Sequence, residues 1–111
     1  MDDKQREIVR ERLEVELAET MAELERLEKK LQAEVEYGLG EGDPSIAERE
    51  MNMALRRRAR RKVKSMQEAL RRSEEGTYGI CERCETKISA QRLDALPQAQ
   101  LCIQCAQQAG R

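Results

Sequence analysis

A narrow apolar stripe runs through the first third of the chain. Its members are spaced by three or four residues, which keeps them on one face of a helix for several turns. Mostly Glu, Lys and Arg stand between them, and neither Gly nor Pro interrupts residues 5–37. We predict a helix over about residues 5–37 that needs a partner helix, with the stripe Leu13, Leu17, Met21, Leu24, Leu27, Leu31 and Val35.

Residues 38–44 contain three glycines and a proline, which end this helix. Two starts are open for the next helix: Asp43 as N-cap with the proline at the first helical position, or a capping box of Ser45 and Glu48. Gly76 stands where a helix C-cap glycine belongs. The second helix, to about residue 74, carries the stripe Ala47, Met51, Leu55, Ala59, Val63, Met66 and Leu70.

Charge favours pairing of the two helices. Residues 1–37 hold 12 acidic and 7 basic residues, a net of −5, whereas residues 45–73 hold 3 acidic and 10 basic, a net of +7. Two helices joined by a short turn fold back as an antiparallel hairpin. We predict an all-α protein with a long antiparallel coiled-coil hairpin over residues 1–75, its tip at about 38–44, and a small C-terminal module over residues 76–111.

Composition narrows the class of protein. Charged residues make up 39% of the 111 residues and aromatic residues 2%, which suits long helices and not a thick core. No signal peptide and no apolar stretch of membrane-spanning length is visible, so we expect a cytoplasmic protein without a membrane partner. In a reducing cytosol, four cysteines favour metal binding over disulfides.

The four cysteines form two Cys-x-x-Cys pairs with 17 residues between them. Two intervening residues let a tight turn aim both thiolates at one ion, and the longer loop brings the second pair round to close a tetrahedron. A dithiol redox pair and an iron–sulfur cluster are the alternatives, and the spacing favours zinc over both. We predict one structural Zn²⁺ held by Cys81, Cys84, Cys102 and Cys105, whose binding is coupled to folding of the module.

With hairpin and cysteine pairs in place, the chain resembles the DksA/TraR family of bacterial transcription regulators. The match is dense between Tyr78 and Cys105 and rests on Cys81-Glu82-x-Cys84, Ile88, Arg92, Pro97, Cys102 and Cys105. The resemblance implies a protein that binds bacterial RNA polymerase and not specific DNA sequences. It implies a hairpin that enters the secondary channel, with acidic tip residues directed toward the catalytic magnesium.

The tip departs from the family pattern. Family members carry Asp-x-Ala there, whereas Glu41 and Asp43 occupy about those places here, and Asp43 is equally interpretable as a helix cap. Members that bind ppGpp use basic residues where this chain has Leu96 and Ala106. A diphosphate needs charge-assisted donors. We therefore expect regulation of transcription without ppGpp.

Seven cations lie within the nine residues 56–64. They are interpretable as a solvated face paired with the first helix, as a docking surface for polymerase, or as a nucleic-acid site. Cations surround the helix, so some face solvent or a partner. The predicted partner-binding residues are Arg58, Arg61, Lys62 and Arg92, and Arg92 in its signature position is also expected to brace the module through backbone carbonyls.

Two other functions remain open at this point. One is a zinc-ribbon protein that binds nucleic acid through residues 56–64, and the other is a structural adaptor that dimerises through its coil. We expect a monomer. We expect no enzymatic activity, because the chain lacks histidine and all four thiols are committed to metal.

Overall fold

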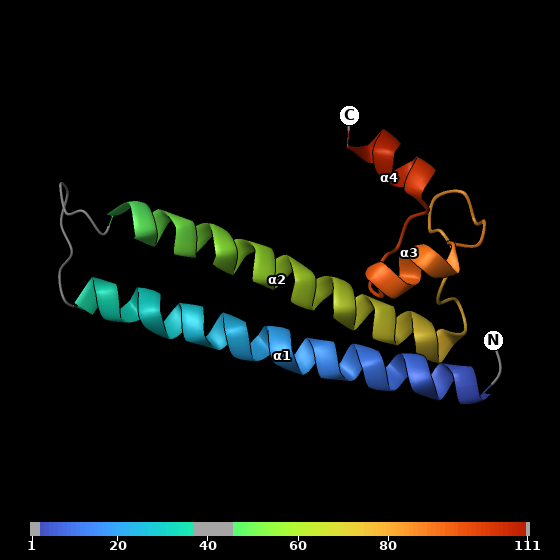
Figure 1. Ribbon diagram of the computed structural model, residues 1–111, viewed down its shortest axis with the longest axis horizontal. Coiled ribbons are helices and arrows are strands. Elements are labelled where there is room, and N and C mark those ends of the chain that lie inside the picture. The colour runs from blue at the N-terminus through green and yellow to red at the C-terminus, as the bar shows by residue number, and fades with distance from the viewer. Residues whose placement is uncertain (1–2, 37–45, 111) are drawn as a thin grey trace.

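The computed structural model describes residues 3–36 and 46–110. Helices α1 (Asp3–Glu36) and α2 (Ile46–Glu75) lie side by side and antiparallel, and a small module containing α3 (Ala90–Ala95) and α4 (Ile103–Ala109) sits at the end of the hairpin opposite the tip (Figure 1). The described part of the chain measures 54 × 32 × 19 Å. The predicted all-α class, hairpin and C-terminal four-cysteine cluster are confirmed.

Helix α1 is long because nothing in its sequence breaks it. Its 34 residues contain neither Gly nor Pro. Oppositely charged side chains one turn apart support it, as in Arg10–Glu14 at 3.1 Å and Glu25–Lys29 at 3.0 Å. Each such pair contributes about 0.2–0.5 kcal/mol. The tertiary stability of the hairpin therefore comes from the face that α1 packs against α2.

Helix α2 ends on a glycine, as the sequence predicts. Gly76 has a φ of 81°, in the left-handed region that glycine adopts without a steric cost. The Thr77 N–H donates to the Arg72 carbonyl at 2.9 Å, and the Gly76 N–H donates to the Ser73 carbonyl at 3.4 Å. These two bonds form a Schellman motif, which satisfies carbonyls at the end of the helix and turns the chain into the module.

The seam between α1 and α2 is tightest near the module. Leu13 and Met66 are fully buried there, with Ala69 1% exposed. Further along, Ala59 on α2 and Leu31 on α1 are also buried. These residues belong to the predicted stripes, apart from Ala69, which lies between Met66 and Leu70. At these positions, apolar spacing identifies the buried face.

At other positions along the two helices, the predicted seam is wrong. Met21, Val35, Met51, Leu55 and Ala47 were expected in the seam and are exposed. Polar residues replace them, because Thr20 on α1 and Asn52 on α2 are 5% and 8% exposed. A straight helix drifts by about 20° per heptad relative to a 3.5-residue repeat. Such a drift moves the line of contact off the apolar stripe at these positions, although Leu31 on the same stripe stays buried.

Three ion pairs join α1 to α2 in the described ranges. Lys30 pairs with Glu48 at 2.8 Å, Arg60 with Glu28 at 3.0 Å, and Arg49 with Glu34 at 3.6 Å. Their signs agree with the opposite charges of the two helices. Solvent screens such pairs, so they select the register more than they stabilise it.

The module is attached to both helices of the hairpin. Arg12 of α1 donates to the Asp94 carbonyl of α3 and pairs with its carboxylate at 3.8 Å. Arg72 of α2 donates to the carbonyl of Ile80. Within the module, the Tyr78 hydroxyl donates to the Pro97 carbonyl at 2.9 Å. No helix among the described residues is long and apolar enough to cross a membrane.

Candidate metal centre

The first cysteine pair lies on a tight turn directly after the hairpin. The Glu85 N–H donates to the Cys81 carbonyl at 3.0 Å, and the Cys81 N–H donates to the Thr86 carbonyl at 2.8 Å. Glu85 has a φ of 63°, so the chain reverses there. The two residues between Cys81 and Cys84 fill this turn, and both sulfurs come to the same side of it.

The second cysteine pair opens the last helix. Cys102 is the N-cap of α4, and Cys105 lies one turn further along the same helix. The Ala106 N–H donates to the Cys102 carbonyl at 2.9 Å, which fixes the first turn. The two pairs meet because the loop between them returns to the first turn, where the Glu82 N–H donates to the Gln100 carbonyl at 3.0 Å.

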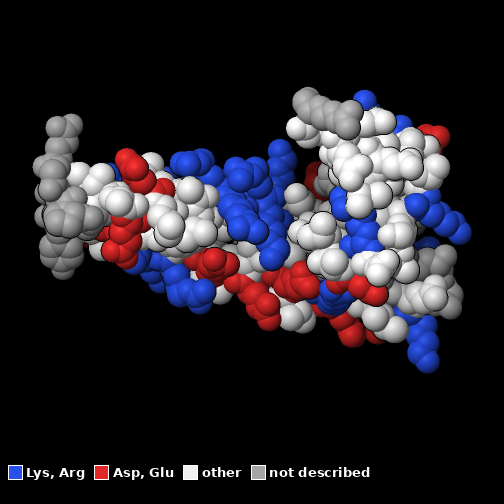
Figure 2. Space-filling model, turned by 45° about the horizontal axis from the view of Figure 1, so that its top comes forward, with Lys and Arg blue, Asp and Glu red and all other residues white. Residues whose placement is uncertain are grey.

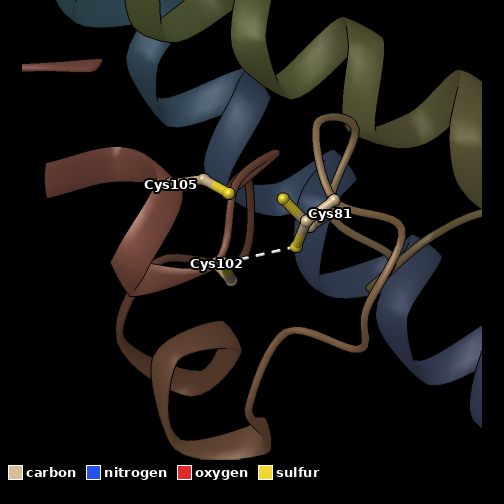
Figure 3. A group of neighbouring side chains, drawn as sticks. Cys81, Cys102 and Cys105 are labelled. Atoms are coloured by element: carbon tan, nitrogen blue, oxygen red, sulfur yellow. Dashed lines mark hydrogen bonds between the residues drawn. The ribbon is translucent and has the colours of Figure 1, made fainter. Parts of the chain in front are cut away.

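All four sulfurs gather at one point. They lie within 4.8 Å of one another, and Sγ of Cys84 is 3.7 Å from Sγ of Cys102. Figure 3 shows the sulfurs of Cys81, Cys102 and Cys105 turned toward a common centre. A zinc ion bound at 2.3 Å by four sulfurs gives a tetrahedron with edges of about 3.8 Å. The cysteine cluster has the size and the donor set of such a site.

The electrostatic interactions among the four thiols also favour the binding of a cation. The backbone N–H of Cys84 contributes most to lowering the pKa of the Cys81 thiol to about 6. Conversely, the hydrogen bond between the side chains of Cys105 and Cys102, together with burial of Cys105, raises the pKa of the Cys105 thiol to about 12. Adjacent thiolates repel, so the cluster retains a proton unless a positive ion neutralises it. A divalent metal supplies that charge.

The apolar core of the module is small. It consists of Cys81, Ile88 and Cys105, with Leu93, Leu101 and Cys102 packed against it. Half of these six residues are cysteines of the cluster. A core with this little apolar surface is too small to hold the module together without another constraint. Metal binding therefore supplies much of the folding free energy of the module.

Arg92 braces the loop between the two cysteine pairs. Its Nε donates to the Leu101 carbonyl at 3.0 Å, and its backbone N–H donates to the Ser89 hydroxyl oxygen at 3.1 Å. Leu101 directly precedes Cys102, so the guanidinium positions a ligand-bearing segment. This is the backbone contact that its signature position suggests. Its predicted role in partner binding stays a prediction.

Arg72 is a structural residue that the sequence pattern did not indicate. It is 4% exposed, donates to the carbonyls of Thr77 and Ile80, and places Nε 3.7 Å from a carboxylate oxygen of Glu82. Its acceptors lie in the segment that leads into Cys81. The only available signal was a cation in the last turn of a helix, which is common at exposed positions as well.

The predicted partner-binding cations on α2 are exposed. Figure 2 shows Lys and Arg side chains crowded midway along the hairpin, beside the module. Arg58 and Lys62, one turn apart, line a hollow of about 190 Å³ together with Leu55 and Glu23. Arg61 is exposed as well. Of the cations in residues 56–64, Arg60 alone has an ion-pair partner across the hairpin among the described residues.

The remaining predicted site residues are those assigned to the tip. Glu41 and Asp43 fall within residues 37–45, outside the part of the chain that the structure describes. The start of α2 at Ile46 therefore does not choose between the two predicted caps. The tip role of both residues stays a prediction.

Comparison with known proteins gives the same family at the level of sequence. Residues 76–109 match the prokaryotic dksA/traR C4-type zinc finger. The RNA polymerase-binding transcription factor DksA of Salmonella typhimurium is 37% identical over 65 residues, which cover 57% of this chain and 43% of the relative. An uncharacterized protein of Aquifex aeolicus is 49% identical over 43 residues, 39% of this chain and 30% of that protein. The match thus spans less than half the length of these relatives.

The resemblance in structure is more extensive. The transcription factor DksA2 of Pseudomonas aeruginosa aligns with a TM-score of 0.77 and 25% identity, over 98% of this chain and 85% of that one. The family motif and the geometry of the sulfurs agree on the metal, so the four cysteines hold one structural zinc ion. Residues 76–109 thus carry the C4 zinc finger of the DksA/TraR family, and the hairpin and module together have the fold of a solved member, DksA2.

Proposed function

We propose that this protein is a cytoplasmic transcription regulator that binds bacterial RNA polymerase. The observation that carries the proposal is the combination of a DksA/TraR zinc finger with a hairpin that aligns with DksA2 over 98% of the chain. Relatives that are 37% identical over 65 residues, 57% of this chain, are named RNA polymerase-binding transcription factors. The proposed protein is a binding protein and not an enzyme, because its four thiols serve as zinc ligands.

The hairpin has the dimensions of a probe that enters a channel. Helix α1 has 34 residues and is therefore about 51 Å long at 1.5 Å per residue. The hairpin is two helices thick and carries charged side chains along its length. We propose that it enters the secondary channel of the polymerase, with Glu41 and Asp43 toward the active site and the module outside.

The exposed cations of α2 supply the docking surface. Positions 58, 62, 65, 69 and 72 follow one another at intervals of three or four, so they share one face of α2. Arg72 at the end of this face holds the module, which places Arg58 and Lys62 on the side of the hairpin that faces the module. An acidic surface of the polymerase would contact Arg58, Lys62 and the module together. Arg61 and Arg92 belong to the same proposed interface.

We propose that binding does not require ppGpp. Leu96, directly before the module's proline, is 41% exposed, and Ala106, directly after the last cysteine, is half-buried. Neither side chain donates a hydrogen bond to a phosphate. The proposed interface therefore lacks charged donors at the two positions that ppGpp-binding members use.

The test is a titration of the zinc-loaded full chain against fluorescently labelled bacterial core RNA polymerase. We expect saturable binding that Arg58→Glu with Lys62→Glu weakens at least tenfold. The matched control is Arg10→Glu with Lys29→Glu, which changes the net charge equally on exposed α1 positions and leaves binding nearly unchanged. Equal weakening by both pairs would contradict a local docking surface. A ppGpp-dependent gain in affinity would contradict the second proposal.

Nucleic acid is the competing ligand for the same cations. Affinity for DNA or RNA that falls steeply with salt concentration, without affinity for polymerase, would favour that function. The same titration in the presence of duplex DNA distinguishes the two.

A further inference from the structure

The four zinc ligands differ in their access to solvent. Cys81 is 1% exposed and Cys105 is 7% exposed, Cys102 is half-buried, and Cys84 is exposed. Water, protons, chelators and electrophiles reach a metal site through its most accessible ligand. Cys84 is therefore the corner of the site at which exchange of the metal would begin.

A hydroxyl group stands at this corner. Oγ1 of Thr86 lies 2.9 Å from Sγ of Cys84. A zinc-bound cysteine is a thiolate and has no proton to give, so in the metal-loaded protein the hydroxyl donates and the sulfur accepts. The most accessible ligand thus has a hydroxyl donor beside it.

The fold fixes Thr86 in this place. The left-handed turn at Glu85 brings Thr86 back over the cysteine pair, and the Cys81 N–H donates to the Thr86 carbonyl at 2.8 Å. Directly after it, Lys87 forms an antiparallel bridge with Ile80. Thr86 is therefore bound through its backbone to the first ligand of the pair and through its hydroxyl to the second.

We propose that Thr86 is a positioning residue that retains Cys84 on the zinc, and that Cys84 is the ligand from which the metal is released first. A donor to a metal-bound thiolate withdraws charge from the sulfur and makes it a weaker target for protons and electrophiles. It also fixes the sulfur in the direction of the metal. The residue type at position 86 therefore sets how readily the site opens, independently of any partner of the protein.

The first test measures transfer of zinc from the loaded full chain to a chromophoric chelator. Thr86→Val keeps the shape of the side chain and removes the donor, and we expect it to accelerate zinc transfer about tenfold. Thr86→Ser restores the hydroxyl and is expected to restore the slow rate. Thr77→Val is the matched control, because the Thr77 hydroxyl contacts the Arg72 carbonyl and no sulfur. Equal rates for Thr86→Val and the unaltered protein would overturn the proposal.

The second test identifies the ligand that leaves first. With limiting iodoacetamide, the thiolate sulfur forms a bond to carbon, iodide departs and the zinc–sulfur bond breaks. Peptide mass spectrometry is expected to find the first modification on Cys84, at a higher rate in Thr86→Val. First modification at Cys102 would contradict the assignment.

A spectroscopic test separates the hydrogen bond from general loosening of the fold. In the cobalt-substituted protein, loss of a donor raises the energy of the sulfur lone pairs. Thr86→Val is therefore expected to move the sulfur-to-cobalt charge-transfer band to longer wavelength, and Thr86→Ser to leave it in place. An unchanged band in Thr86→Val would overturn the proposed hydrogen bond.

Discussion

Arg12 of α1 and Asp94 of α3 are joined across 82 positions of sequence. The guanidinium donates to the Asp94 carbonyl, and it lies 3.8 Å from the carboxylate of the same residue. This contact connects the helix farthest from the zinc in the sequence to the loop between the two cysteine pairs. It holds the module against both helices of the hairpin, and not only against the one that leads into it.

Removal of the Arg12 side chain tests this connection. Arg12→Ala is expected to lower the stability of the protein by about 1 kcal/mol, because exposed ion pairs contribute little and the carbonyl bond adds to them. Thermal unfolding followed by circular dichroism measures the change. Arg10→Ala is the control, since the ion pair of Arg10 with Glu14 lies within α1. An equal loss in both variants would mean that the contact with Asp94 contributes nothing.

Arg72 is expected to contribute more, because it is buried. Arg72→Met keeps much of the volume but leaves the carbonyl of Ile80 without its donor, and we expect a loss of about 2–3 kcal/mol. Urea unfolding of the zinc-loaded protein measures it. Arg71→Met provides the comparison, because the exposed Arg71 pairs with Glu68 and Glu75 of its own helix. A neutral Arg72→Met would show that the buried guanidinium does not anchor the module.

Asn52 is expected to weaken the hairpin near its tip. It is 8% exposed, and its Nδ2 has no hydrogen-bond partner in the described structure. Asn52→Leu is expected to raise the free energy of unfolding by about 1–2 kcal/mol, since it removes an unsatisfied buried donor and adds apolar contact. The urea midpoint reports the gain. Met51→Leu next to it is 65% exposed in the unaltered chain and is expected to change little.

The gain in stability from Asn52→Leu is expected to lower the specificity with which the helices pair. A polar residue in a helical seam fixes the register and the number of strands of a coiled coil. Sedimentation of Asn52→Leu at several concentrations is expected to show stronger association than that of the unaltered protein. A variant that is both less stable and still monomeric would contradict the assignment of Asn52 as an unsatisfied seam residue.

Zinc removal is expected to unfold the module and spare the hairpin. The module has a core of three buried residues, two of them ligands, whereas the seam of α1 and α2 contains no ligand. A strong chelator should therefore remove a small part of the helical circular dichroism signal and expose residues 76–110 to protease. Complete loss of helix on chelation would contradict an independently stable hairpin.

The parts of the fold that depend on local signals were predictable from the sequence. The spacing of Cys81, Cys84, Cys102 and Cys105 in the sequence predicts a tetrahedral metal site. Gly76 is a glycine, the residue type that adopts the φ of this position without a steric cost. The hairpin followed from two helices of opposite charge joined by a glycine-rich turn. Each of these features depends on residues that are close together in the sequence.

The contacts that depend on tertiary placement were not predictable in the same way. Thr20 and Asn52 are buried between the two helices, and the apolar spacing within either helix does not indicate this. Arg12 and Arg72 resemble the many exposed arginines of the chain until the module is placed beside them. The contact of Thr86 with the zinc-binding Cys84 can be recognised only once the turn at Glu85 is known.

Photo-crosslinking tests the proposed position of the hairpin on RNA polymerase. A photoreactive residue replaces Gln32, exposed near the tip end of α1, and in a second variant Gln67, exposed near the module end of α2. In complexes of the zinc-loaded chain with core RNA polymerase, we predict crosslinks from position 32 to residues inside the secondary channel and from position 67 to its outer rim. Crosslinks from both positions to the same outer surface, or none from position 32, would contradict insertion of the hairpin.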